Sequence, residues 1–335
     1  MAGDVITIAH GGGGTRMQDL LREIIFPLLG GDTLNTAEDA ACLELPPGKL
    51  AFTTDSFVVK PIFFSGGDIG KLAVCGTVND LSMVGARPLY LTLGLILEEG
   101  LRLEDLERVL RSIAEWSTVA GVRVVAGDTK VVERGMADGL YVNTAGVGVI
   151  PDGRSISISG AVVGDALIVN GYVGDHGVAV LKDRDGFGFQ LDVGSDCAPL
   201  NSLVEAMLGV GTVHSLRDPT RGGLAAALKE MADASGRAME LVEKDIPVRG
   251  EVRAVCEMLG LDAMLVANEG KLLAAVPESD STAILQAMKS HPLGADSSVI
   301  GRVTEGRKGR VSVLTPLGSA RLLRMPSGEQ LPRIC

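Results

Sequence analysis

The chain has 335 residues, which is long for a single hydrophobic core and favours two domains. Its net charge of -11 argues against a general nucleic-acid surface, since neutralising phosphates takes clustered Lys and Arg. The longest apolar run, around LYLTLGLIL, is too short to span a membrane, and the first residues match no signal or transit peptide. We therefore expect a cytoplasmic protein that binds neither nucleic acid nor membrane.

The first half of the chain predicts a mixed α/β unit. In chain order, hydrophobic periodicity predicts a helix over 17–29, a strand over 49–59, a helix over 66–86, a strand over 87–97, a helix over 104–121 and strands over 122–128 and 139–150. Residues 151–160 gather Pro, Gly and polar side chains without periodicity, which is typical of a domain boundary. We place the first domain over 1–152.

The second half predicts another α/β unit, over 153–325. It begins with a strand over 165–171, followed by helices that begin near His176, Leu200 and Leu224. A strand over 271–276, a helix over 280–290 and a strand over 297–303 follow. Residues 326–335 contain two prolines and a glycine and show no periodicity, so we expect a mobile tail that ends in Cys335.

The five cysteines form no C-x-x-C pair and have no histidine at ligand spacing. A structural zinc site and a disulfide framework are both disfavoured. Four of them, Cys42, Cys75, Cys197 and Cys256, lie in apolar or helical contexts and are expected to be small core residues. Cys335 is the exception, because it is the last residue of the chain.

The common nucleotide-binding motifs do not fit this sequence. Residues 65–72, SGGDIGKL, resemble a P-loop, but Ser65 replaces its first glycine and Leu72 replaces the Ser or Thr that holds magnesium. No G-x-G-x-x-G stretch lies between a predicted strand and helix, and no kinase catalytic loop is present. A nucleotide would have to bind in another way.

Four aspartates sit at turns or interrupt apolar elements, and they are Asp39, Asp55, Asp80 and Asp128. A carboxylate in an apolar element is unfavourable unless a cation meets it. Magnesium is the natural candidate, because it takes oxygen ligands from a few carboxylates, phosphates and water. The alternative is that each aspartate is an ordinary cap or turn residue.

Glycine-rich segments could supply backbone donors to phosphate. The first is HGGGG, with Gly11, Gly12, Gly13 and Gly14; the second is DPTRGG, with Asp218, Gly222 and Gly223 at the start of a predicted helix. Residues 171–181, GYVGDHGVAVL, repeat the arrangement. Each is also compatible with a plain helix start, with Asp218 as an N-cap and His176 as a first-turn residue.

The motifs EDAA, TTDSFVV, VNDLSMVGARP, AGDTKVV, GDHG, DPTRGGL and ANEGK, in this order, resemble the PurM-like ATP-dependent enzymes. This family includes aminoimidazole ribonucleotide synthetase, selenophosphate synthetase and thiamine monophosphate kinase. The resemblance implies an α/β (α+β) fold of two PurM-like domains with mixed sheets, whose N-terminal domains pair into a dimer β-barrel. It also implies ATP and Mg2+ as cofactors, held by the four aspartates, with Thr129 beside the phosphates.

The terminal PRIC, together with HGGGG, is similar to the HypE branch of that family, the carbamoyl dehydratases of hydrogenase maturation. The resemblance implies that the Cys335 thiol receives a carbamoyl group from a carbamoyltransferase (HypF). ATP then drives dehydration of this group to a thiocyanate, and the cyano group passes to iron on a HypC–HypD scaffold as a ligand for nickel–iron hydrogenase.

The dehydration needs a base, and Glu269 and Lys130 are the candidates in that family context. Lys130 could instead neutralise phosphate charge, and the sequence leaves both roles open. The nine residues from Ser327 onward can extend over roughly 30 Å, enough for the thiol to visit two sites.

Two other functions stay open at this point. One is a related kinase or synthetase that acts on a small diffusible substrate, and the other is a passive carrier on which Cys335 holds a group while a partner does the chemistry. The set of aspartates favours an enzyme that turns over ATP itself.

Overall fold

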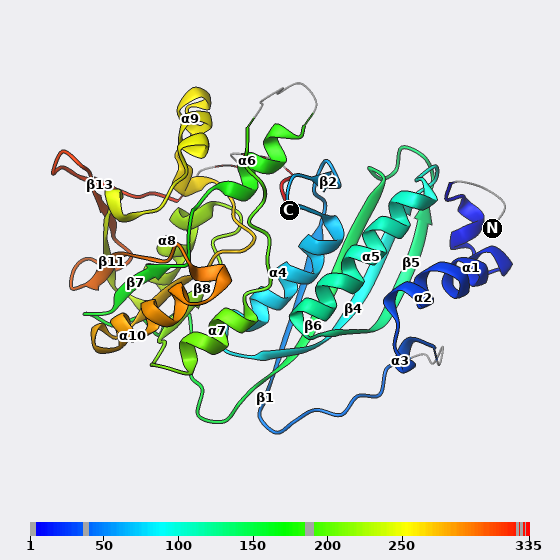
Figure 1. Cartoon of the computed structure of the whole chain (residues 1–335), viewed down its shortest axis with the longest axis horizontal. Helices are drawn as coiled ribbons and strands as arrows, with labels where there is room; N and C mark the ends of the chain where they lie inside the picture. The colour runs from blue at the N-terminus through cyan, green and yellow to red at the C-terminus, as the bar shows by residue number, and fades with distance from the viewer. Residues whose placement is uncertain (1–4, 36–39, 185–190, 326–327, 329–330, 332) are drawn as a thin grey trace.

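The computed structural model describes residues 5–35, 40–184, 191–325, 328, 331 and 333–335. These residues form two α/β units side by side, each built on its own sheet (Figure 1). One sheet has four strands and the other has seven, and both contain parallel and antiparallel neighbours. The predicted α/β class with mixed sheets is confirmed.

The four-stranded sheet has the order β1 (Lys49–Phe57), β6 (Leu140–Ile150), β4 (Arg87–Glu98) and β5 (Arg123–Val132). The pairs β1/β6 and β6/β4 are antiparallel, whereas β4/β5 is parallel. Helices α4 (Ile69–Met83) and α5 (Leu103–Ala120) cover one face of this sheet (Figure 1). Alternate residues of β4, from Leu91 to Leu97, are buried under them, as a strand with one covered face requires.

Short helical pieces flank the β5 edge of this sheet (Figure 1). They are η1 (Ile8–Gly11), α1 (Thr15–Leu20), the π-helical turn η2 (Leu21–Ile25), α2 (Phe26–Leu29) and α3 (Asp32–Asn35). The helix predicted over 17–29 is thus present in three consecutive pieces.

The helix predicted from residue 66 begins later, because a small hairpin of β2 (Phe63–Phe64) and β3 (Gly67–Asp68) precedes α4. The Asp68 carboxylate accepts hydrogen bonds from the backbone N–H groups of Gly70 at 2.8 Å and Lys71 at 3.0 Å. Asp68 is therefore the N-cap that fixes the start of α4 at Ile69.

The seven-stranded sheet has the order β13-β12-β9-β11-β7-β10-β8. Its strands are β7 (Ala166–Val169), β8 (Ser215–Arg217), β9 (Ala238–Val242), β10 (Leu273–Val276), β11 (Ser298–Thr304), β12 (Val311–Leu314) and β13 (Ala320–Leu322). Helix α8 (Gly223–Ser235) packs on one face, and α7 (Asn201–Leu208) and α10 (Glu278–Lys289) pack on the other. Because both faces are covered, β7 is apolar at every position.

The remaining helices of this unit are α6 (Asp175–Lys182) and α9 (Gly250–Leu259), with the short 3-10 turns η3 (Glu243–Asp245), η4 (Ala263–Leu265) and η5 (Pro292–Gly294). The sequence analysis did not predict α9 or the strands β8, β9, β12 and β13. Within the described residues, no helix combines the length and the apolar composition that crossing a membrane requires.

Three of the four cysteines predicted as core residues are buried, namely Cys75, Cys197 and Cys256. The prediction for Cys42 is wrong, because that side chain is exposed. Residues 41–48, between α3 and β1, adopt no regular structure, and most of their side chains face solvent.

One buried amide joins the two units. Asn79, in α4, donates from Nδ2 to the carbonyl oxygens of Ala198 at 3.1 Å and Glu269 at 3.2 Å. Its Oδ1 accepts the backbone N–H of Leu200 at 2.8 Å. A buried polar side chain with all these partners satisfied fixes α4 against the second unit, and the candidate site lies along this junction.

Candidate functional site

Four carboxylates lie where the two units meet, and we call them the interdomain group: Asp55 on β1, Asp80 in α4, Asp218 after β8 and Glu269 before β10. Asp218 and Glu269 are only 8 % and 3 % exposed. The four are close enough that their negative charges raise one another's pKa values. The structure thus brings together two predicted metal ligands, one predicted phosphate-site residue and one predicted base.

Burial is the main cause of the raised pKa values in this group, and like charge is the next. Burial, followed by the charge of Asp80, raises the pKa of Asp218 to about 7. Burial also raises the pKa of Glu269 well above its usual range, and it raises those of Asp55 and Asp80. The charges of Arg217 and Arg221 only partly offset these increases, and a bound cation would supply further positive charge.

The chemistry of the donors fits Mg2+, because all are carboxylate oxygens and this hard cation prefers oxygen. In the part of the chain that the structure describes, no three His, Cys, Asp or Glu residues lie close enough to hold a metal ion by themselves. Magnesium commonly binds through only one or two carboxylates, with phosphate oxygens and waters as its other ligands. The interdomain group therefore fits a metal that arrives with a nucleotide.

Strand β1 helps to orient two of these carboxylates, Asp55 and Asp80. Thr53 and Asp55 lie on the same face because strand side chains alternate. The Thr53 hydroxyl donates to Asp80 Oδ2 at 2.9 Å, and the Ser56 backbone N–H donates to Asp55 Oδ1 at 2.7 Å. The carboxylates are therefore held in place before any ligand binds.

The predicted phosphate loop before α8 turns sharply through two glycines in the left-handed region. Gly222 has φ 78° and Gly223 has φ 61°. A Cβ atom on Gly223 would lie 2.5 Å from the carbonyl oxygen of Met264, so only glycine fits there. This turn lets the chain enter α8 tightly against η4.

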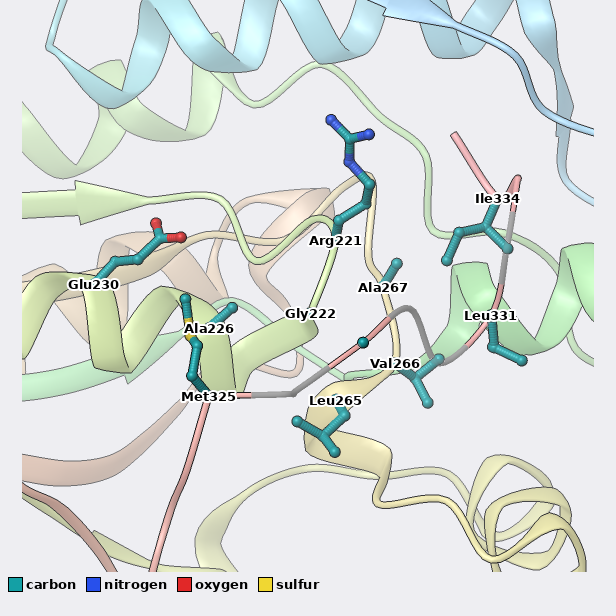
Figure 2. Close-up of a pocket in the computed structure, with 11 residues that line it drawn as sticks. Arg221, Gly222, Ala226, Glu230, Leu265, Val266, Ala267, Met325, Leu331 and Ile334 are labelled. Atoms are coloured by element: carbon teal, nitrogen blue, oxygen red, sulfur yellow. The ribbon is translucent and has the colours of Figure 1, made fainter.

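A cavity of about 410 Å³ opens beside this turn, with Arg221 and Gly222 on one side and Leu331 and Ile334 of the tail on another (Figure 2). Figure 2 shows the Arg221 side chain extending away from Gly222. Its guanidinium forms no hydrogen bond or ion pair with the described residues, yet its charge lowers the pKa of Asp55. The sequence analysis missed Arg221, although it stands inside DPTRGG, because only the aspartate and the glycines of that motif were considered.

The remaining predicted residues form a second set at the far edge of the four-stranded sheet, the β5 group: Gly11, Gly12, Gly13, Gly14, Asp128, Thr129 and Lys130. Lys130 Nζ pairs with Asp128 Oδ1 at 2.6 Å, and both side chains are about two-thirds exposed. Thr129 lies between them on β5 and is buried on the opposite face. Gly11 packs against Val131, where a Cβ would lie 2.9 Å from the backbone nitrogen.

Strand register shows why the two groups are apart in one chain. Asp55 lies in the same row as Thr144, Leu93 and Gly127, so β5 is three strands away from β1, a distance of about 14 Å. Asp128 follows Gly127 and therefore lies on the other face of the sheet. Within one chain Asp128 and Lys130 do not reach Asp55. Asp39, the fourth predicted metal ligand, lies outside the described residues.

The end of the tail lies along the segment that follows β1. The Val58 N–H donates to an oxygen of the Cys335 α-carboxylate at 3.2 Å, and the Lys60 N–H donates to the Arg333 carbonyl at 3.2 Å. The Arg333 Nε donates to the Val58 carbonyl at 3.0 Å, so the two segments run antiparallel. Leu331 and Ile334 are buried. The structure gives one position of the tail, and its movement stays a prediction.

His176 is a second residue whose role the sequence did not reveal. It is wholly buried at the start of α6, and its Nε2 lies 2.6 Å from the carbonyl oxygen of Ile334. Its position after Gly174 and Asp175 was noted, but only the fold brings it to a tail residue 158 positions away.

Comparison with known proteins places the chain in a family. Residues 37–150 match the model of the AIR synthase related protein N-terminal domain, and residues 162–314 match that of its C-terminal domain. The chain is 50 % identical to the carbamoyl dehydratase HypE of Azotobacter vinelandii over 331 residues, 98 % of this chain and 97 % of that protein.

Two solved structures are also similar. A HypE in complex with ATP has a TM-score of 0.94 at 47 % identity, covering 98 % of this chain and 99 % of that one. A HypE–HypF complex has a TM-score of 0.81 at 43 % identity, covering 93 % and 100 %. The chain therefore belongs to the AIR synthase related (PurM-like) family and, within it, to the HypE carbamoyl dehydratases.

Proposed function

We propose that this chain catalyses the ATP-dependent dehydration of a carbamoyl group on the Cys335 thiol to a thiocyanate. The product supplies the cyanide ligand of the iron in nickel–iron hydrogenase during maturation. One observation carries the proposal: an oxygen of the Cys335 α-carboxylate accepts a hydrogen bond from the Val58 N–H at 3.2 Å. Val58 follows Asp55 by three residues, so the chain ends about 10 Å from a carboxylate of the interdomain group.

Dehydration requires the carboxamide oxygen to leave, and an oxide ion is a very poor leaving group. Transfer of a phosphoryl group from ATP to this oxygen lets it leave as phosphate, and loss of both N–H protons completes the carbon–nitrogen triple bond. Glu269 is suited to accept a proton, because its raised pKa makes its carboxylate a stronger base than an exposed glutamate. The nearby Arg221 guanidinium can offer planar paired donors to phosphate oxygens.

We propose that Mg2+ binds through one or two carboxylates of the interdomain group, drawn from Asp55, Asp80 and Asp218, together with nucleotide phosphates, and that Asp39 is a further candidate. Bound Mg2+ would neutralise charge on the phosphate oxygens during the transfer. The chain itself orients these ligands, since the Thr53 hydroxyl holds Asp80 at 2.9 Å. Gly222 lines the cavity at the start of α8, and the tight turn at Gly223 positions that start for phosphate. The β5 group, with Gly11–Gly14 and Thr129, offers further donors.

We also propose that two copies pair through the four-stranded sheets into a β-barrel. Helices cover only one face of the sheet, and the other face exposes apolar side chains: Leu50 is 60 % exposed, Phe52 67 % and Ile96 42 %. An apolar face of this kind is unfavourable in water and is typical of an interface. Closing a barrel would also cover the open edges β1 and β5, and it can bring the β5 group of one copy to β1 of the other.

The reaction requires two further partners. A solved structure contains a relative of this chain together with HypF, and we propose a HypF-type carbamoyltransferase as the donor of the carbamoyl group. We propose a HypC–HypD iron scaffold as the acceptor of cyanide. In both steps the Cys335 sulfur would have to leave the docked position, which the length of the tail allows.

The test is the mass of the C-terminal peptide. The full-length protein, carbamoylated by the carbamoyltransferase, is mixed with ATP and Mg2+ and then cleaved with a glutamate-specific protease. We expect the peptide to lose the mass of one water. A peptide that keeps the whole carbamoyl mass would instead support a passive carrier.

Two variants control this experiment. Cys42→Ser removes the other exposed thiol and should leave the reaction unchanged. Cys335→Ser should accept no carbamoyl group and show no water loss. ATP turnover by Cys335→Ser on a small diffusible substrate would favour the kinase or synthetase alternative.

A further inference from the structure

Two sets of contacts hold the end of the tail. The outer set includes the backbone pairing of Arg333 and Cys335 with the segment after β1. It also includes the Arg333 side chain, which donates to the Val58 carbonyl and pairs with Asp138, and Arg184 Nη2, which donates to the Arg333 carbonyl at 2.6 Å. The inner set is one buried side chain, His176, which contacts the main-chain carbonyl of Ile334. This contact differs from those of an ordinary core histidine, because a wholly buried ring nitrogen meets the backbone of the C-terminal tail.

His176 has 0 % exposure, and its Nε2 lies 2.6 Å from the main-chain carbonyl oxygen of Ile334. Phe64 meets the imidazole edge-on, with ring centroids 5.5 Å apart and an interplanar angle of 89°. In the described chain, Ile334 is the one hydrogen-bond partner of this nitrogen. The ring is therefore held by packing, and its Nε2 is directed at the tail.

The neighbouring hydrogen bonds determine which ring nitrogen carries the proton. Ser195 Oγ accepts the Cys197 N–H at 3.1 Å and lies 2.8 Å from His176 Nδ1. The Ser195 hydroxyl hydrogen is then available to donate to Nδ1, which leaves the ring proton on Nε2. Nε2–H can donate to the Ile334 carbonyl, which only accepts.

The environment favours this neutral form of the ring. Burial lowers the pKa of His176, while the charge of Asp196 acts in the opposite direction. The Asp196 charge is largely compensated, because its carboxylate pairs with Lys271 at 3.1 Å. Asp196 Oδ1 also accepts the backbone N–H of Glu269 at 3.1 Å.

These contacts link the tail to the proposed base. Ser195 and Asp196 are consecutive residues. Ser195 orients His176, and Asp196 holds the turn that carries Glu269. The acceptor on the tail is a backbone carbonyl and not the sulfur. The contact is therefore the same whether Cys335 carries a thiol, a thiocarbamate or a thiocyanate.

We propose that His176 is a positioning residue that latches the C-terminal tail by its backbone and so presents the group on Cys335 to the interdomain group. This inference rests on the dehydration proposed above. His176 acts through Ile334 and does not touch the reacting atoms. A buried donor without its acceptor is unfavourable, so the latch favours the docked tail, and release requires a partner to compete for it.

The first test measures access to the Cys335 sulfur without any activity. The free, full-length protein is alkylated, and the modified fraction of the C-terminal peptide is followed by mass. His176→Phe keeps a ring but removes the donor, and we expect roughly tenfold faster alkylation, which corresponds to about 1.4 kcal/mol and lies within the range for one hydrogen bond. His176→Gln, which can place an amide N–H near Nε2, should alkylate close to the wild-type rate.

Two controls keep this test decisive. His291→Phe changes a histidine outside the site and should alkylate at the wild-type rate. If His176→Phe does not fold, Ser195→Ala removes the hydroxyl that orients the ring, and we expect about threefold faster alkylation. A folded His176→Phe protein that alkylates at the wild-type rate overturns the latch.

The second test separates the two reaction steps. In His176→Phe we expect water loss to be about tenfold slower at saturating ATP, with the KM for ATP unchanged and carbamoylation by the partner at least as fast as in the wild type. An equal fall in carbamoylation and water loss would indicate a merely structural role and overturn the proposal. If the wild type itself loses no water, the proposed function fails, whereas the alkylation comparison still decides the latch.

Discussion

The interdomain group and the β5 group both combine acidic residues with glycines, yet their environments are opposite. Burial raises the pKa of Asp218 in the interdomain group to about 7. In the β5 group, Asp128 is 67 % exposed and already paired with Lys130. Buried carboxylates whose pKa values stay raised despite nearby arginines favour a further cation from outside the chain, whereas an exposed ion pair contributes little to stability. The interdomain group is therefore arranged to bind a cation, whereas the β5 group would gain a role only if a second copy of the chain covered it.

The largest expected effect comes from testing whether a second copy covers the β5 group. Asp55→Asn and Asp128→Asn should each slow water loss by about 10³-fold, because each removes charge needed around the phosphates. If the groups meet across a twofold dimer, a dimer with one chain of each variant contains one intact site out of two, and it should recover about half of the wild-type rate. Two differently tagged chains, co-expressed and purified through both tags, provide the mixed dimer for the mass assay.

A mixed dimer as inactive as either parent would contradict the pairing of the two groups across the interface. Phe52→Asp provides an independent check, because a charge on the open sheet face should convert the dimer to a monomer in size-exclusion chromatography. Glu104, exposed on α5 away from that face, offers the matched control as Glu104→Lys, which should leave the dimer intact.

The second-largest expected effect concerns how the free energy of unfolding of the metal-free protein depends on pH. The folded pKa of Asp218, about 7, exceeds the unfolded value, so between these values the folded state binds more protons and stability falls as pH rises. Asp218→Asn removes this titration. At pH 8 its free energy of unfolding should exceed that of the wild type by up to roughly 4 kcal/mol, since each pKa unit corresponds to about 1.4 kcal/mol. The two proteins should converge near pH 4.

Denaturant unfolding in the presence of a chelator, at pH 4, 6 and 8, measures this difference. Mg2+ with ATP should reduce it, because ligand binding stabilises the wild-type carboxylate. Asp233→Asn, at an exposed position of α8, is the control and should show no growth of the difference with pH. A constant difference between Asp218→Asn and wild type at all three pH values would show that the Asp218 carboxyl does not titrate in this range.

The sequence predicted which kinds of residue form the site better than it predicted where they lie in the fold. Periodicity identified the long elements such as α5 and β4, and polar residues inside apolar elements identified Asp55 and Asp80. Their burial and mutual approach follow from α4 packing against β1, which no local pattern contains. The face occupied by Asp128 depends on strand register, and a one-residue change would reverse it.

Long-range contacts account for what the sequence could not reveal. His176 meets the tail across 158 positions, and Arg221 faces Asp55 from another domain. The short strands β8 and β13, of three residues each, carry too few positions for a period to be recognised. Cys42 was expected to be buried from its apolar neighbours, but it lies in an irregular segment whose side chains are mostly exposed.

The smallest expected effect separates the two roles left open for Lys130. Its ammonium group pairs with Asp128 at 2.6 Å, so we expect Lys130 to neutralise charge and not to act as the base. Lys130→Arg keeps the charge and should retain most of the rate of water loss, whereas Lys130→Met should lose about tenfold. Equal losses in both variants would contradict this, because arginine preserves the charge but cannot serve as a base. Lys130 would then join Glu269 as a candidate base, and the β5 group would take part in proton transfer as well as in binding.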